Sequence, residues 1–394
     1  MNLFALILFI ISFSTIVILI SNKKNFGVAM LIGSAILAIA IPYKIWNVFI
    51  ETITDFKVIA LMIIVVLIKL LATILEESGL IELIRGMEKL LATRGMIVAT
   101  PALLGLLPVP GGALLSAPIV KKQGDKLGMD NETKMAVNLW YRHIGFMIYP
   151  LSTSLILLAG LSGIDIYTLI LLQLPIFFIS FFVGLIFVYK YKGGGKNKDG
   201  EGNFKALIPI LLPVVIAVPL SIFFSQFFSK SIATYISYLI AIPAGVAIAV
   251  KMAKRKINFK KGISFTLAIA IFAIMLFKNI INSTGLTMQL SSYLNFLPPI
   301  ILIPIVSFII GILTAHNMAA IAILYPIFSY IMNVHLVIIM FISSFFGYLV
   351  SPLHLCIAVT YEYFHPKFGD FYKKIVPPSI VVMIIAVLIY GMMG

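Results

Sequence analysis

The sequence predicts an all-α integral membrane protein with about ten transmembrane helices plus two re-entrant hairpins, arranged in two inverted-topology repeats. Three observations lead to this prediction: an apolar composition, a series of apolar stretches, and similar breaks in both halves of the chain. Of the 394 residues, 61% are hydrophobic and only 11% are charged, whereas about a quarter of the residues of a soluble protein are charged. So much apolar surface requires lipid as its solvent.

Ten apolar stretches have about the length that a helix needs to cross the hydrocarbon core. Lys23 and Lys24 follow the first stretch and no cleavage site does, so we expect a retained span rather than a signal peptide. The predicted spans are 2–20, 27–43, 57–75, 134–160, 166–189, 206–227, 232–251, 263–281, 333–358 and 375–393.

Two further apolar stretches, 95–120 and 297–330, are interrupted by Pro, Gly or polar residues. Loops rich in Lys and Arg mark the cytoplasmic side of a membrane protein. In this chain, loops rich in Lys and Arg alternate with loops poor in them only if each interrupted stretch enters and leaves the membrane on the same side. We therefore predict an inside hairpin at 95–120 and an outside hairpin at 297–330, with both termini outside. The net charge of +15 then reflects topology, and we expect no nucleic-acid partner.

An internal repeat is indicated by breaks that recur about 200 residues apart. Each half has three spans, a hairpin, a broken span and a last span. The first repeat covers 1–190, a cytoplasmic Gly- and Lys-rich linker covers 191–205, and the second repeat covers 206–394. The matching positions are Gly105 and Gly311, Gly145 and Gly347, Pro150 and Pro352, and Pro175 and Pro377.

The first hairpin has a tip at Pro110, Gly111 and Gly112, where a helix cannot continue. A helix restarting at Ala113 would direct its positive N-terminus into the membrane and favour an anion. We therefore expect this tip and Ser116 to contact substrate. A simple Pro-kinked span is the alternative.

The second hairpin places Thr314, His316 and Asn317 inside an apolar stretch. Asn317 is a suitable N-cap for a helix beginning at Met318, and its amide can donate to and accept from a ligand. These three residues are predicted to bind substrate, with an ordinary buried histidine as the alternative for His316.

The broken spans carry the remaining candidates. Arg142 and His143 are predicted to balance substrate charge or to couple protons, unless Arg142 extends to the cytoplasmic interface. Carbonyl groups freed at the two breaks suit Na⁺ or substrate hydroxyls. The substrate-binding candidates at these breaks are Ser152, Thr153, Ser351 and His354.

Other functional classes lack their signals. Cys356 is the single cysteine, so we expect no disulfide within the chain and no metal cluster. The sequence contains no Walker A, HExxH or GxSxG motif. We predict that the protein is not an enzyme and needs no cofactor other than Na⁺ as a coupling ion.

Three strings, GLLPVPGGALLSAP, GILTAHNMAAIAILYP and SPLHLC, resemble a prokaryotic membrane family, domain-of-unknown-function family 401, over nearly the whole chain. The resemblance implies membership of the ion transporter superfamily of secondary carriers and residence in the plasma (inner) membrane. It also implies a homodimer, a scaffold part and a mobile part in each repeat, and elevator-type movement. Dicarboxylate carriers of that superfamily have Ser-Asn-Thr at the hairpin tips, and only Asn317 matches this pattern here.

We therefore expect a secondary active transporter that moves a small anionic organic solute by alternating access, coupled to Na⁺ or H⁺. An ion or solute channel is one alternative. An intramembrane enzyme acting on a lipid-linked substrate is another, with Glu76 and Glu77 as its only paired acids.

Overall fold

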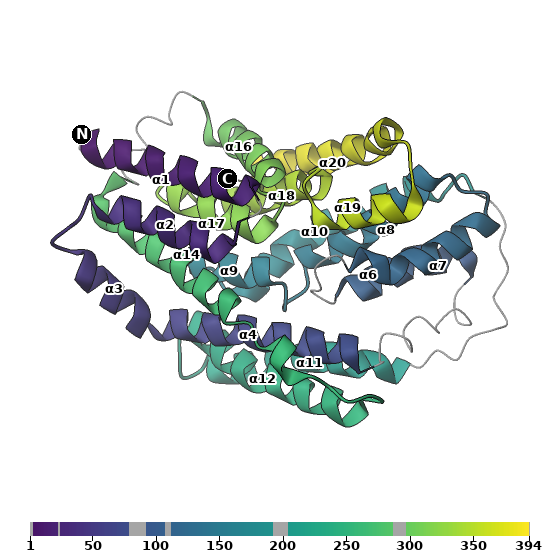
Figure 1. Ribbon diagram of the computed structural model, residues 1–394, viewed down its shortest axis with the longest axis horizontal. Helices are drawn as coiled ribbons and strands as arrows, with labels where there is room; N and C mark the ends of the chain where they lie inside the picture. The colour runs from purple at the N-terminus through teal and green to yellow at the C-terminus, as the bar shows by residue number, and fades with distance from the viewer. Residues whose placement is uncertain are drawn as a thin grey trace.

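The computed structural model describes residues 3–22, 24–78, 92–106, 112–191, 204–286 and 297–393, and their regular elements are helices (Figure 1). Within these ranges, seven helical segments are long and apolar enough to cross a membrane. The protein is therefore an all-α, multi-pass membrane protein. The seven segments are Leu3–Ser21, Phe56–Glu77, Ile166–Phe187, Lys230–Met252, Phe259–Thr284, Val334–Phe364 and Phe368–Gly391.

Two of the predicted spans are shorter helices than expected, and a third is divided. The stretch 27–43 forms α2 (Phe26–Ala38), which ends before Pro42 because proline cannot donate a helical hydrogen bond. The stretch 206–227 forms α11 (Ile208–Phe224). The stretch 134–160 divides into α8 (Asn131–Ile144) and α9 (Thr153–Ser162), with Pro150 in the break.

One group of helices comes from the first part of each half of the chain. α4, α11 and α12 form the lower layer in Figure 1, and α14 packs against α4, α2 and α3. α1 completes the group by packing against α2. Besides α2 and α11, its members are α1 (Leu3–Ser21), α3 (Ile45–Thr54), α4 (Phe56–Glu77), α12 (Lys230–Met252) and α14 (Phe265–Thr284).

The second group comes from the later part of each half. α6 packs against α7 and α8, and α16 packs against α17 and α18. α20 then joins the two sets by packing against α8, α10 and α18. Besides α8 and α9, its members are α6 (Thr93–Gly105), α7 (Ala113–Lys126), α10 (Ile166–Gly184), α16 (Pro299–Thr314), α17 (Asn317–Phe328), α18 (Val334–Val350), α19 (Leu355–Phe364) and α20 (Phe368–Gly391).

Glycines allow the closest helix crossings of the second group. A Cβ atom at Gly105 of α6 would overlap the carbonyl oxygen of Arg142 in α8. Where α16 crosses α18, a Cβ at Gly347 would overlap the Phe308 carbonyl oxygen, and one at Gly311 would overlap the carbonyl oxygen of Ser344. Both crossings therefore bring one backbone directly against another.

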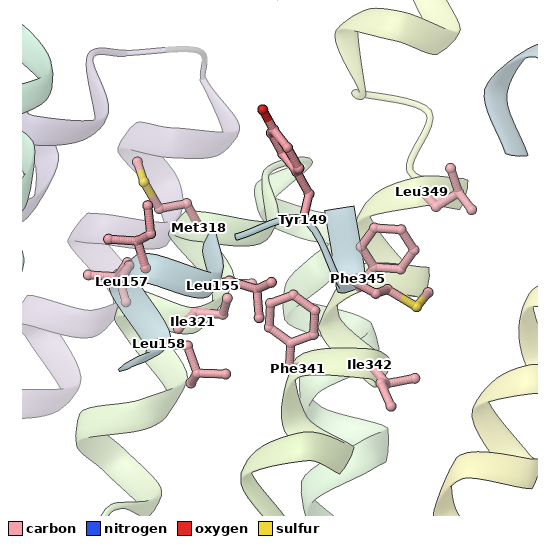
Figure 2. Close-up of a cluster of buried hydrophobic side chains, with 14 of the residues drawn as sticks. Tyr149, Leu155, Leu157, Leu158, Met318, Ile321, Phe341, Ile342, Phe345 and Leu349 are labelled. Carbon is pink, nitrogen blue, oxygen red and sulfur yellow. The ribbon is translucent and has the colours of Figure 1, made fainter. Parts of the chain in front are cut away.

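A buried apolar cluster joins α9, α17 and α18. Figure 2 shows Leu155 and Leu158 of α9, Ile321 of α17, and Phe341 and Phe345 of α18 around a common centre. All five side chains are at most 1% exposed. Since burying one such side chain stabilises a fold by about 1.5–3 kcal/mol relative to water, the cluster fixes these three helices relative to one another.

Candidate functional site

A cavity of about 240 Å³ lies where three breaks in the helices meet. Its walls come from the end of α8 and the α8–α9 break, from the α16–α17 turn, and from α18 with the start of α19. The lining residues are Arg142, His143, Phe146, Tyr149, Leu151, Ser152, Thr153, Ser154, Ala315, His316, Asn317, Phe345, Tyr348, His354, Leu355 and Cys356.

Three helix N-termini face this cavity. Ser152, His316 and His354 are the N-cap residues of α9, α17 and α19, and all three line the cavity. None of the three caps its helix through a side-chain hydrogen bond. The first N–H groups of a helix have no intrahelical acceptor, and the helix dipole makes them an anion-binding feature.

The breaks arise from local sequence. Pro150 and Pro352 lack the N–H that would continue α8 and α18. The α16–α17 turn instead passes through Ala315, whose φ of 51° lies in the left-handed region. Such a conformation is strained for a residue with a Cβ, so the surrounding structure must hold the turn in place.

Arg142 places a positive charge on the cavity wall. Its side chain is only 1% exposed, and its Nη1 donates to the Leu104 carbonyl of α6 at 2.8 Å. The guanidinium also lies close to the Cys356 side chain, which lines the same cavity. None of the residues that line the cavity is Asp or Glu. The cavity therefore presents a cation beside three helix N-termini.

Three histidines surround Tyr348 in the cavity. The ring of His354 lies 4.2 Å from that of Tyr348 and 4.8 Å from that of His143, measured between centroids. The His316 ring lies 6.5 Å from that of Tyr348. His143 Nδ1 donates to the Leu139 carbonyl at 2.6 Å, which fixes its tautomer because a carbonyl oxygen only accepts.

Buried hydrogen bonds hold the cavity walls in register. Ser344 Oγ of α18 donates to Asn317 Oδ1 at 2.9 Å. Ser351 Oγ donates to the Ile312 carbonyl of α16 at 2.6 Å. On the α7–α8 side, Asn138 Nδ2 donates to the Ala113 carbonyl at 3.0 Å. Each bond ties α7, α16 or α17 to the neighbouring α8 or α18 segment.

The structure brings together seven of the predicted site residues. Those that line the cavity are Arg142, His143, Ser152, Thr153, His316, Asn317 and His354. α7 begins at Ala113 as predicted. α17 begins at Asn317 rather than Met318, so Asn317 is the first helical residue and not the N-cap. Its side chain accepts from Ser344 instead of capping the helix.

Four predicted residues lie outside the cavity wall. Gly112 precedes α7, and Ser116 Oγ donates to Asn138 Oδ1 at 2.6 Å. Thr314 Oγ1 donates to the Ile310 carbonyl. Ser351 makes the bond to α16 described above. Pro110 and Gly111 lie outside the described residues.

Sequence reasoning missed the aromatic part of the wall, namely Phe146, Tyr149, Phe345 and Tyr348, together with Cys356. Such residues are common on lipid-facing and core-facing positions, so they give no polar signal within a span. Their nearness to the predicted breaks is the one signal that could have identified them.

Residues 5–393 match the family model described as Protein of unknown function (DUF401). The chain belongs to the DUF401 family. The resemblance of the three strings is therefore confirmed at the level of this family. No curated protein matches this DUF401 chain.

Proposed function

We propose that this DUF401 protein is a secondary active transporter that moves a small organic anion across the plasma membrane of a prokaryote by alternating access. One observation carries the proposal: Arg142 and the N-termini of α9, α17 and α19 converge on one cavity.

The charge of the cavity supports an anionic substrate. A buried arginine is costly in a membrane unless a negative group approaches it, and its planar guanidinium suits a carboxylate. Helix N-termini contribute backbone N–H donors, and they do so without burying a second full charge. Interrupted helices that direct their N-termini at an anionic group are a recurring design of secondary transporters.

The size and apolar lining support a small acid with an apolar body. A volume of about 240 Å³ has room for several water molecules and therefore for a small organic anion. Phe146, Leu151, Phe345 and Leu355 also line it. A short-chain monocarboxylate fits these two properties better than a strongly hydrated dicarboxylate.

The helix order supports the two inverted repeats, with an inside and an outside hairpin. α6 and α7 have 13 and 14 residues, and α16 and α17 have 16 and 12. At about 1.5 Å per residue, each is shorter than the hydrocarbon core of about 30 Å. The predicted pairs Gly105–Gly311 and Gly145–Gly347 also fall at helix crossings or breaks.

In this proposal the first helix group is a scaffold and the second helix group is the mobile part. This assignment agrees with the expected membership of the ion transporter superfamily. The protein is also expected to form a homodimer and to have both termini outside. Na⁺ or H⁺ supplies the driving gradient, and His143 is the candidate for H⁺.

The two alternatives receive less support. A channel would need a continuous pore, and Phe345 of the buried apolar cluster in Figure 2 is part of the cavity wall. An enzyme would need Glu76 and Glu77 as its paired acids. Glu77 instead accepts from the Asn258 N–H at 2.8 Å and pairs with Lys261 at 3.0 Å, which links α4 to the segment before α14.

The test is uptake of labelled short-chain monocarboxylates into proteoliposomes with a Na⁺ gradient, a H⁺ gradient or neither. We expect saturable uptake that one gradient accelerates and that Arg142→Gln lowers at least tenfold. Arg255→Gln makes the same chemical change at an exposed position and should leave uptake unchanged. Equal uptake by the wild type and Arg142→Gln would exclude the proposed site, and unitary conductance would favour the channel.

A further inference from the structure

A cluster of three metal-ligating side chains lies in the cavity wall. His143, His354 and Cys356 are buried, and each offers one ligand atom within 4.8 Å of the others. Zinc binds His nitrogen at about 2.0–2.1 Å and Cys sulfur at about 2.3 Å, so tetrahedral ligand atoms lie about 3.3–3.6 Å apart. A movement of about 1 Å would therefore close the cluster around an ion.

His143 is oriented as a metal ligand. Its Nδ1–H donates to the Leu139 carbonyl at 2.6 Å, so its Nε2 carries the lone pair. Metal-ligating histidines usually donate their other ring N–H to a backbone carbonyl or a carboxylate in this manner, which fixes both the tautomer and the ring orientation.

His354 supplies a second, independent observation. Its side chain is 3% exposed, and its Nδ1 has no hydrogen-bond partner among the described residues. Leaving a buried polar atom without a partner costs about 1–3 kcal/mol. A bound metal ion would remove this cost by accepting the nitrogen lone pair.

Cys356 lies at the start of a helix and beside a cation. It is the second residue of α19 (Leu355–Phe364), and the N-terminus of a helix stabilises negative charge. The Arg142 guanidinium lies close to the Cys356 side chain and places a full positive charge near the sulfur. Cysteine sulfur is a ligand that soft divalent metal ions prefer.

We propose that His143, His354 and Cys356 form a binding site for a soft divalent transition-metal ion, with Zn²⁺ as the probe. Binding replaces the Cys356 S–H bond with an S–metal bond and releases one proton to solvent. Imidazole and thiolate ligands favour zinc-like ions over Na⁺, Mg²⁺ and Ca²⁺, which take oxygen ligands. Three protein ligands leave the fourth tetrahedral position to water. The site does not depend on whether the protein carries an organic anion.

The experiment measures metal binding by the full-length protein in detergent. The protein is loaded with Zn²⁺, passed over a desalting column and analysed for metal content. The same protein is titrated with Co²⁺, because a cobalt–thiolate bond gives a near-ultraviolet charge-transfer band that histidine ligands alone do not give. The variants are Cys356→Ser and His354→Gln, with His335→Ala as a control outside the cluster.

We expect about one Zn²⁺ per chain and the thiolate band with Co²⁺ for the wild type and for His335→Ala. Cys356→Ser should lose the band, and both cluster variants should lose the stoichiometric ion. Wild-type protein that retains no zinc, a cobalt complex without the thiolate band, or Cys356→Ser protein that retains its ion would each overturn the proposal. If a variant fails to fold, the wild-type cobalt spectrum decides alone. Failure of anion uptake leaves these readouts unchanged, so the two proposals are separately testable.

Discussion

Replacing Gly347 by alanine tests one of the closest helix crossings among the described residues. The new Cβ would overlap the Phe308 carbonyl oxygen and lie 2.9 Å from the Phe308 carbonyl carbon. Both atoms belong to the backbone of α16, so no side chain can rotate away and the helices must separate. Overpacking of this kind costs about 1–3 kcal/mol, and a rigid neighbour places the cost near the upper value. A loss of about 3 kcal/mol lowers the folded-to-unfolded ratio by about 100-fold.

The matched control is Gly369→Ala, because a Cβ at Gly369 in the first turn of α20 meets nothing within 4 Å. That change should be neutral or stabilise the protein by up to about 1 kcal/mol through helix propensity. The assay is the fraction of protein that remains monodisperse after heating in detergent, measured across temperatures. If Gly347→Ala and Gly369→Ala melt together, the backbone contact does not limit stability and the reasoning is wrong.

Two further predictions concern groups outside the cavity. Burial opposes ionisation of Asp130, but hydrogen bonds from Thr133 and Lys374 outweigh it and hold the pKa of this carboxyl well below its usual range. A carboxyl whose pKa is lower in the folded state than in the unfolded state stabilises the protein at pH values above the unfolded pKa of about 4. This stabilisation is lost as the pH falls below that value. Asp130→Asn should therefore reduce thermal stability at pH 7, by at most about 1 kcal/mol for a partly exposed pair. The difference in stability between the variant and the wild type should shrink below pH 4. A difference that stays the same at low pH would contradict this reasoning. Tyr238→Phe removes the hydroxyl that donates to the Pro150 carbonyl at 3.0 Å. The variant should lose about 1 kcal/mol of stability and keep the same anion affinity. Binding and melting curves measured on one preparation would check both expectations.

The fold class followed from the sequence because a membrane imposes strict length and composition limits. Helices α4, α10 and α12 lie close to their predicted spans. The differences occur where a local breaker competes with apolar composition, as at Pro42 after α2. Hydropathy measures the solvent a segment prefers, and it does not locate a break within an apolar run.

The polar part of the candidate site was also predictable, because polar groups within apolar spans are costly and therefore conspicuous. His316 and His354 were found for this reason. Tyr348 and Cys356 were not, since neither is unusual in a membrane span. Asn138 was missed as well, although its amide bonds the Ala113 carbonyl and Ser116. Such hydrogen-bond partners depend on which helices pack together. The periodicity of a single segment does not predict those contacts.

Cys356 has a practical consequence because it is the sole thiol in the chain and lies on the cavity wall. The unaltered protein thus carries a single reporter position, with no background cysteines to remove. A membrane-impermeant maleimide, applied separately to intact cells and to inverted vesicles, would read out which compartment has access to that wall. Under the proposed alternating access, added solute should shift the labelling from one preparation to the other.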